Sequence, residues 1–301
     1  MSDKTTIIIS EGRHSDSSRR TLERELAEAL QRWPHVAVVT LPHLYDLAPE
    51  GPAMQHLQAV SGDIIVVASL YPRAAYWVLD ANQVKGRIGR TSFFSEEEQD
   101  AGAAEKATDR TIWCLDIRGQ SDTGPLLQEI RQIVAESQGI AAEDVSGDGK
   151  AAAGEITRVD ETVEHRWYPV IDYGRCANCL ECMNFCLFGV FGIDESGQLM
   201  IEQPDACRDG CPACSRVCPS QAIMFPPHHT PAIAGDHTAP AETYTPDLVQ
   251  LSGGGSPLNL AAAERDRALE EAAPDGQPPS DQPPARDELD ALVDDLDKMD
   301  L

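Results

Sequence analysis

Eight of the nine cysteines in this 301-residue chain lie within 43 consecutive positions. They form two runs, since residues 176–186 have the spacing C-x2-C-x2-C-x3-C and residues 207–219 have the spacing C-x3-C-x2-C-x3-C-P. The candidate metal ligands are Cys176, Cys179, Cys182, Cys186, Cys207, Cys211, Cys214 and Cys218. This clustering predicts four segments: an N-terminal domain over 1–140, a linker over 141–165, a cysteine domain over 166–226 and a tail over 227–301.

The net charge of −26 excludes several classes of protein. A polyanion of this size does not bind nucleic acid or anionic lipid through bulk electrostatics. The longest apolar run, around Ile64 to Tyr71, falls far short of the roughly 20 residues that cross a bilayer. The first residues lack the pattern of a signal peptide. We therefore expect a cytoplasmic protein that neither enters a membrane nor binds nucleic acid, and whose cysteines bind metal rather than form disulfides.

The spacing of the cysteines favours a four-iron cluster over zinc. Three cysteines separated by two residues lie on one tight loop and can bind three corners of a cubane, while the fourth corner must be reached from elsewhere in the chain. Structural zinc sites use two pairs of ligands separated by ten or more residues. Two four-cysteine runs with a trailing Pro219 do not have that spacing.

Residues 167–226 resemble the bacterial two-cluster ferredoxins of the 4Fe–4S type. In that family the fourth cysteine of each run serves the other cluster. The resemblance implies a small α+β domain with two 4Fe–4S clusters. One cluster would take Cys176, Cys179, Cys182 and Cys218, and the other would take Cys186, Cys207, Cys211 and Cys214.

Two departures from the ferredoxin pattern concern the second of these ligand sets. Leu187 follows Cys186 where the family has proline, and three residues separate Cys207 from Cys211. The extra Gly210 can let the longer loop close, because glycine accepts unusual backbone angles. Cys207 is the ligand that this insertion affects most.

The flanks of the cysteine runs predict a lead-in strand over 168–173 and a closing strand over 223–225. Several large apolar residues between them predict a dry shell, which limits solvent access and helps to set a reduction potential. Four thiolates for each cluster leave no iron open to a substrate. This argues for outer-sphere electron transfer, without bond making at the metal.

Residues 1–140 alternate apolar runs with amphipathic segments. The pattern predicts strands near 6–9, 35–41, 64–67 and 111–117, with helices between them and a last helix near 126–134. Valine- and isoleucine-rich strands separated by helices indicate a parallel sheet covered on both faces. We expect residues 83–110 to form a mobile excursion, and Cys114 to act as a small apolar residue of the core.

The order of these elements, with His14 after the first strand, resembles the chelatase-like domains of the sirohydrochlorin cobaltochelatase type over residues 5–138. The predicted fold is accordingly α/β, chelatase-like or flavodoxin-like. The family's second metal-site histidine is missing from residues 70–73, so its metal-insertion chemistry is not expected here. The region also lacks a G-x-G-x-x-G motif and a P-loop, and we expect His14 to be an exposed loop residue.

The linker and the tail have compositions that favour flexible chain. Residues 141–165 are rich in alanine, glycine and acids, and residues 227–301 carry a net charge of −12 with many prolines. We expect His228, His229 and His237 to be solvated. Apolar residues at helical spacing over 287–300 predict either an acidic helix that docks on a basic partner or a frayed, solvated helix.

The sequence thus predicts an iron–sulfur electron carrier that acts on a redox partner protein. No catalytic constellation stands out, so whether the chain is itself an enzyme stays open. One alternative is a redox enzyme, or a protein that handles a metal or tetrapyrrole, with a small ligand on the N-terminal domain. Another is a scaffold whose clusters are purely structural.

Overall fold

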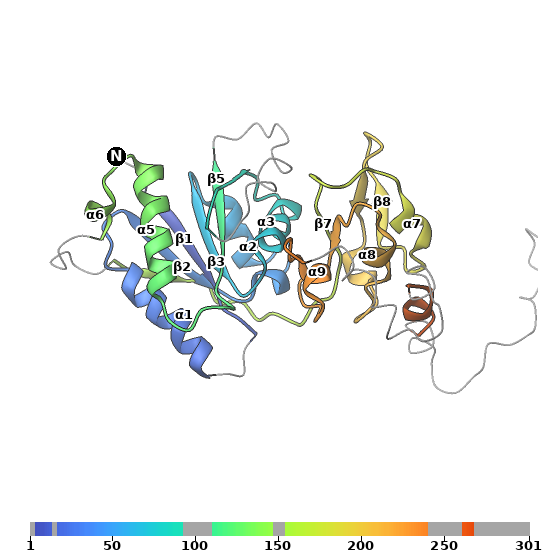
Figure 1. Cartoon of the computed structure of the whole chain (residues 1–301), viewed down its shortest axis with the longest axis horizontal. Coiled ribbons are helices and arrows are strands. Elements are labelled where there is room, and N and C mark those ends of the chain that lie inside the picture. Colours follow the sequence, from blue (N-terminus) through green and yellow to red (C-terminus); the bar gives the residue numbers. More distant parts are fainter. Residues whose placement is uncertain (1–3, 14–16, 93–109, 147–153, 240–260, 268–301) are drawn as a thin grey trace, which may run out of the picture.

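The structure is a computed structural model that describes residues 4–13, 17–92, 110–146, 154–239 and 261–267. The described residues form an α/β region and a cysteine-rich region that lie end to end along the long axis of the molecule (Figure 1). His14, most of the expected excursion at 83–110, and the expected helix at 287–300 lie outside the described residues.

The α/β region is built on one parallel sheet with the strand order β4-β5-β3-β1-β2-β6. Its central strands coincide with the expected apolar runs. The strands are β1 (Thr5–Ser10), β2 (Val36–Leu41), β3 (Ile64–Ala68), β4 (Arg87–Ile88), β5 (Thr111–Asp116) and β6 (Ile156–Arg158). The strand order reverses direction between β1 and β3, as in flavodoxin-like doubly wound folds.

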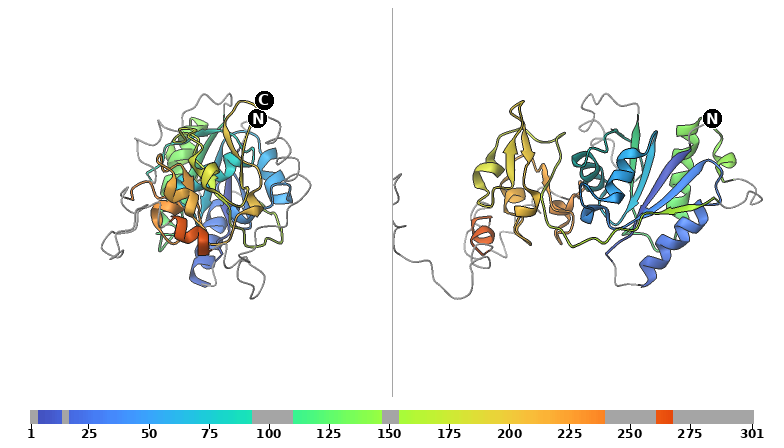
Figure 2. Two further views of the ribbon diagram at one scale, coloured as in Figure 1. Left: turned by 90° about the vertical axis from the view of Figure 1, so that its right-hand side faces the viewer. Right: turned by 180° about the vertical axis from the view of Figure 1, so that it is seen from behind.

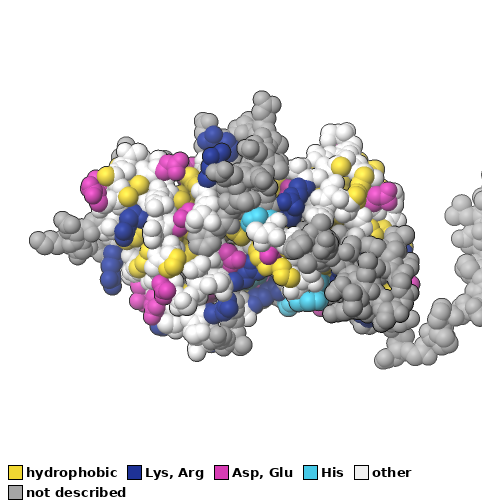
Figure 3. All heavy atoms as spheres, viewed as in Figure 1, with side chains coloured by type: hydrophobic (Ala, Val, Ile, Leu, Met, Phe, Trp, Pro, Cys, Tyr) yellow, Lys and Arg dark blue, Asp and Glu magenta, His cyan; other side chains and the backbone are white. Residues whose placement is uncertain are grey.

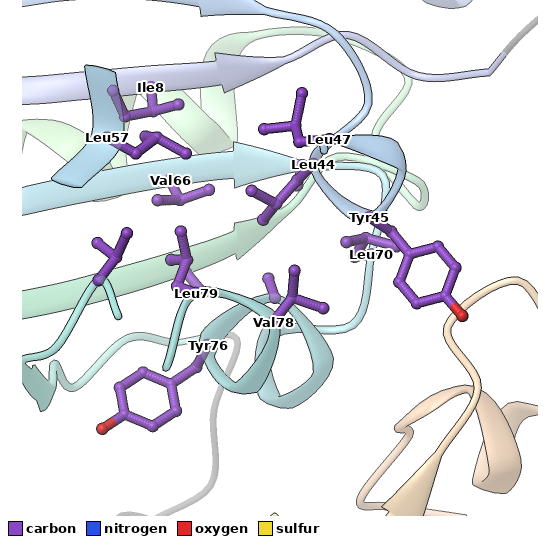
Figure 4. Packing of buried hydrophobic residues seen from close by; sticks show 14 of the residues in the cluster. Ile8, Leu44, Tyr45, Leu47, Leu57, Val66, Leu70, Tyr76, Val78 and Leu79 are labelled. Carbon is purple, nitrogen blue, oxygen red and sulfur yellow. The ribbon is translucent and has the colours of Figure 1, made fainter. Parts of the chain in front are cut away.

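Helices cover both faces of this sheet, which confirms the expected architecture. One face carries Ile8, Val39 and Val66 and packs against α2 (Pro52–Ala59) and α3 (Pro72–Ala81) (Figure 4). The other carries Ile7, Ile65 and their neighbours, and it packs against α1 (Ser17–Leu30) and α5 (Gly124–Gln138). Alternate side chains of a strand point to opposite faces, so a continuous apolar run serves two helix layers at once.

Cys114 is a core residue, as expected. Its side chain lies in β5 and is buried against the α2 and α3 face of the sheet. Burial raises the pKa of the Cys114 thiol, which keeps the group protonated and unreactive.

Part of the segment expected to be a flexible linker is ordered. Ile156 pairs in parallel with Val38, and β6 thereby completes one edge of the sheet. Earlier in the same segment, α6 (Ala142–Val145) buries Val145 in the core. A three-residue strand is too short to show a period in the sequence, so the few apolar residues of this acidic stretch did not predict it.

The edge strand β4 falls in the expected excursion. It pairs with the amino-terminal end of β5, at Arg87↔Thr111 and Ile88↔Ile112. A side chain at Gly89 would collide with the indole of Trp113. The absence of a side chain at Gly89 lets the chain just after β4 pass close to β5. The pairing and this close approach together show that residues 87–88 belong to the sheet.

The cysteine-rich region contains two short antiparallel ladders. Strand β7 (Val170–Ile171) pairs with β10 (Ile223–Met224), which confirms the expected lead-in and closing strands. Strand β8 (Phe191–Ile193) pairs with β9 (Leu199–Ile201). Two helices of five residues, α7 (Glu181–Phe185) and α8 (Ala213–Val217), and the 3₁₀ turn η2 (Pro204–Ala206) complete it.

The beginning of the tail is folded, contrary to the expectation of disorder from residue 227 onward. Helix α9 (Pro231–Ala234) buries Ile233 against the core of the cysteine-rich region. The Phe225 amide donates to the Ile233 carbonyl at 2.8 Å, which closes this segment back onto the end of β10. Residues 261–267 are also helical. A few alanines and one isoleucine within a polar, proline-rich stretch therefore bury more apolar surface than its composition indicated.

A buried ion pair joins the two regions, which lie side by side in the right-hand view of Figure 2 and one behind the other in the left-hand view. Arg73 of α3 donates from Nε to Asp172 Oδ2 at 2.6 Å and from Nη2 to the Gln221 carbonyl at 2.8 Å. Tyr45, in the 3₁₀ turn η1 (Leu44–Asp46), stacks on Tyr168 with ring centroids 4.2 Å apart. These side chains are almost fully buried, so the cysteine-rich region rests directly on the α/β region.

No helix in the described ranges is long and apolar enough to cross a membrane.

Substituting Arg73 tests the junction. Arg73→Ala leaves the Asp172 carboxylate buried without its cation, and we expect the free energy of unfolding to fall by about 3–5 kcal/mol. Urea denaturation followed by tryptophan fluorescence measures this change. Arg24→Ala is the matched control, because it breaks the exposed Arg24–Glu28 pair and should cost no more than about 1 kcal/mol. An equal, small loss in both variants would contradict this account of the junction.

Candidate iron–sulfur site

The first cysteine run begins in a turn that Asp172 holds. The carboxylate accepts hydrogen bonds from the amides of Gly174 at 2.9 Å and Arg175 at 3.2 Å, and the Asp172 carbonyl accepts from the Cys176 amide at 3.0 Å. The same carboxylate binds Arg73. The position of Cys176 is thus fixed by a residue that also anchors the domain junction.

Asn178 holds the next part of the loop. Its backbone lies in the left-handed region with φ 53°, and its side chain bridges to the β8–β9 turn. There Nδ2 donates to the Gly197 carbonyl at 2.9 Å, and Oδ1 accepts from the Leu199 amide at 2.8 Å. Leu180 is also left-handed, with φ 63°. Such angles are unusual for residues other than glycine, and here they wind the chain tightly between Cys176 and Cys182.

The first thiol group consists of Cys176, Cys179, Cys182 and Cys218. Burial, together with the nearby Cys218 and then Cys176 and Cys179, raises the pKa of Cys182 to about 12. Burial likewise raises the pKa of Cys176, to which the charges of Cys218 and Cys179 contribute. The structure therefore brings Cys218, from the second run, together with three cysteines of the first.

The members of this group differ in exposure. Cys182 is buried, Cys176 and Cys218 are half-buried, and Cys179 is exposed. The Ala222 amide donates to Cys218 Sγ at 3.3 Å, next to Gln221, whose backbone is left-handed with φ 52°. Hydrogen bonds from backbone amides to ligand sulfurs are one means by which a protein tunes a metal site.

The second thiol group consists of Cys186, Cys207, Cys211 and Cys214. These four side chains line one small cavity together with Pro169, Phe185, Phe188, Val190 and Phe191. Burial raises the pKa of Cys207, and the charges of Cys211 and Cys186 add to it. Burial also raises the pKa of Cys214, to which Cys182 of the first group contributes. The two groups are thus neighbours, and the second takes Cys186 from the first run.

The inserted residue of the second run behaves as expected. Gly210 lies in the left-handed region with φ 76°, and a Cβ at this position would meet no atom within 4 Å. The loop closes and leaves Cys207 beside Cys211. Leu187, which stands where the two-cluster ferredoxins have proline, is 55% exposed and lines the small cavity of the second thiol group.

Side chains outside the cysteine runs complete the surroundings. The indole of Trp167 stacks on Phe225 with centroids 5.2 Å apart, and its Nε1 donates to the Cys211 carbonyl at 3.3 Å. Asn178, Ala222 and Trp167 were not predicted as site residues. The contacts of Asn178 and Trp167 join segments distant in the sequence, so no local pattern marks them, whereas the Ala222 amide contacts Cys218 only four residues earlier.

The three tail histidines differ from the expectation of full solvation. His228 and His237 are partly buried, and only His229 is exposed. His228 stacks on His229 with ring centroids 4.3 Å apart, and burial lowers the pKa of His228 to about 4. The imidazole of His228 packs near Trp167, with centroids 6.3 Å apart, and is a structural side chain.

Within the described ranges, no three His, Cys, Asp or Glu side chains converge as ligands of one metal ion. Zinc with Zn–S distances of about 2.3 Å needs thiolates roughly 3.8 Å apart. In a four-iron cluster each thiolate binds a different iron, and the thiolates stand further from one another.

The α/β region has a hollow of its own, of about 530 Å³, at the carboxyl ends of its strands. It is lined by Glu11, Glu23, Thr40, Ile156 and Arg158, among others. This places it beside β2 and β6. In doubly wound sheets ligands bind at the reversal of strand order, which here lies between β1 and β3.

Comparison with known proteins supports a ferredoxin-like segment. No family model matches the chain. An uncharacterized ferredoxin of Methanocaldococcus jannaschii is 44% identical over 66 residues, which is 22% of this chain and 44% of that protein. The pyruvate synthase subunit PorD of the same organism is 38% identical over 55 residues, which is 18% of this chain and 62% of that subunit.

The chain therefore spans 44% and 62% of the lengths of these two relatives, less than two thirds of either, and the matched part is about a fifth of its own length. Nothing in the comparisons supports the chelatase-like resemblance of the N-terminal region, for which the structure shows a parallel-sheet α/β fold. The ferredoxin-like segment is the part of this chain whose relationship to known proteins is supported.

Gly210 offers a test of the second thiol group. Gly210→Ala places a Cβ at a left-handed position and should cost about 1 kcal/mol in backbone strain. Because the strain falls between Cys207 and Cys211, we expect faster release of iron to a chelator. Gly62→Ala is the control, since Gly62 is also left-handed with open space around it but lies in the α/β region. Equal release rates in both variants would show that the loop does not hold metal.

Proposed function

We propose that this protein is an electron carrier with two 4Fe–4S clusters. Cys176, Cys179, Cys182 and Cys218 would hold one cluster, and Cys186, Cys207, Cys211 and Cys214 the other. The observation that carries the proposal is the single cavity lined by Cys186 of the first run together with Cys207, Cys211 and Cys214 of the second, with Cys218 of the second run near Cys176 and Cys182 of the first. This is the exchange of fourth ligands found in two-cluster ferredoxins.

The residues present fit such clusters. Thiolates are soft ligands that suit iron–sulfur centres. The second group lines an apolar cavity, and the first receives an amide hydrogen bond at Cys218. Both features are means by which a protein sets the potential of a cluster.

When bound, the clusters would supply one-electron redox chemistry. The chain's own part is to hold them with four thiolates each, to exclude water from the second group, and to leave Cys179 of the first at the surface. With all four irons of each cluster ligated by protein, an electron enters and leaves without a change of ligands. This favours a carrier over an enzyme that binds substrate at iron.

The relatives support a redox partner protein for this carrier. One is named a ferredoxin, and the other is a subunit of a pyruvate synthase. We infer that this chain likewise exchanges electrons with a protein. A reducing compartment such as the cytoplasm suits it, because the eight thiols must stay reduced to bind iron.

Paired substitutions of the cysteines test the assignment. Cys186→Ser with Cys211→Ser removes two ligands of one proposed cluster, and we expect about half of the iron and sulfide to remain in the anaerobically purified chain. Cys186→Ser with Cys176→Ser removes one ligand from each cluster. We expect this pair to lose much more iron, because both clusters are damaged.

The alternative pairing of ligands makes the opposite prediction. If each run bound its own cluster, the Cys186 and Cys176 pair would spare half of the iron and the Cys186 and Cys211 pair would not. Stoichiometric zinc in the unsubstituted protein would overturn the proposed function altogether.

A further inference from the structure

The second thiol group is closed on one side by the helical residues 261–267. Ala261 is fully buried against Cys211 and Ala213. Arg216 Nε donates to both carboxylate oxygens of Glu264, at 2.7 and 2.9 Å. These contacts shield the Cys211 side from any partner.

The Cys207 side of the same group opens on a groove. This groove is a hollow of about 740 Å³ between the two regions, and Cys207 forms part of its wall. Its lining comes from three segments. They are residues 46–49 after β2, the connecting residues 161–167, and Asp205, Cys207 and Asp209 at the start of the second cysteine run.

Arg166 holds the walls of the groove together. Its Nη2 lies 2.9 Å from Asp205 Oδ1, and its Nη1 donates to the Leu47 carbonyl at 2.9 Å. Its amide donates to Asp46 Oδ1 at 3.1 Å. One residue of the connecting segment therefore fixes the α/β region and the second cysteine run relative to each other, so the groove is a built feature of the fold.

The groove is strongly acidic. Its lining includes five carboxylates and a single arginine. Glu161 accepts from the Ala53 amide at 3.0 Å, and Asp46 is ion-paired with Arg13. Burial opposes ionisation of Asp46, but the neighbouring His43 imidazole and the hydrogen bonds from Arg13 and the Arg166 amide outweigh it and hold the pKa of Asp46 at about 2.

The outer carboxylates of the groove face solvent. Glu164 and Asp209 are exposed, and the Asp205 side chain is 78% exposed although it pairs with Arg166. Over the face of the α/β region seen in Figure 3, by contrast, acidic and basic side chains are interspersed. The exposed carboxylates of Glu164, Asp205 and Asp209 thus form a negative rim around the groove, and such a rim attracts a positively charged surface.

We propose, on the basis of the function proposed above, that this groove is the docking surface for a redox partner whose contact face is basic. One electron passes between the second cluster, on its Cys207 side, and the acceptor or donor centre of that partner, with no bond made or broken. Both regions supply the groove, so the α/β region contributes to partner recognition. The cysteine-rich region alone would present only the rim near Asp205 and Asp209.

Charge reversal on the rim tests the docking surface. The variant Glu164→Lys with Asp209→Lys is reduced anaerobically and mixed with a basic c-type cytochrome as the acceptor. At low ionic strength we expect the second-order rate of cytochrome reduction to fall about tenfold or more, because electrostatic steering is lost. Reduction of ferricyanide, a small anion, should not slow.

The control is Glu25→Lys with Glu136→Lys. Both carboxylates are exposed on outer helices of the α/β region, and the change in net charge is the same. An equal fall in both double variants, or a fall in neither, would overturn the docking proposal.

Two further measurements separate the possible failures. Carbodiimide cross-linking to the cytochrome should join its lysines to Glu164 or Asp209, and cross-links confined to other carboxylates would count against the groove. Iron, sulfide and reducibility are measured first in every variant. If the variants hold iron and are reduced, but the rate of cytochrome reduction does not depend on the charges of Glu164 and Asp209, the docking surface is refuted and the proposed function is not. A chain with no reducible cluster refutes the proposed function.

Discussion

The Asp172 carboxylate connects the two halves of this structure. It pairs with the buried Arg73 of the α/β region. At the same time it accepts hydrogen bonds from the amides of Gly174 and Arg175, which directly precede the first cysteine run. A buried carboxylate needs such partners, because unpaired it would cost several kcal/mol. The position of the first thiol group therefore depends on the presence of the α/β region, and the ferredoxin-like segment is held as part of a larger body.

The sequence predicted what depends on local patterns. Apolar runs such as Ile64–Ala68 predicted the central strands, and the resemblance to two-cluster ferredoxins implied the sharing of cysteines between the runs, with which the common cavity of Cys186, Cys207, Cys211 and Cys214 is consistent. Composition was misleading where a few apolar residues sit among polar ones. Ile156 in the expected linker is placed by pairing with β2, far earlier in the chain, and Ile233 in the expected disordered tail is placed by folding back onto the end of β10 and into the core of the cysteine-rich region.

The same limit applies to the site. The roles of Asn178, Trp167 and Arg166 come from hydrogen bonds to segments far away in the chain. Together they give the two thiol groups different surroundings. The first has the exposed Cys179, and the second is covered by residues 261–267 on one side and faces an acidic groove on the other. For the carrier proposed above, two such exits would let an electron enter at one cluster and leave from the other.

The account is tested most directly by an anaerobic reductive titration of the full chain, followed by electron paramagnetic resonance with iron and sulfide analysis. It predicts about eight irons and eight sulfides per chain, two reversible one-electron reductions, and magnetic interaction between the reduced centres, because Cys182 of one group and Cys214 of the other belong to the same buried cluster. A single metal ion without sulfide, or clusters that cannot be reduced and reoxidised, would contradict it.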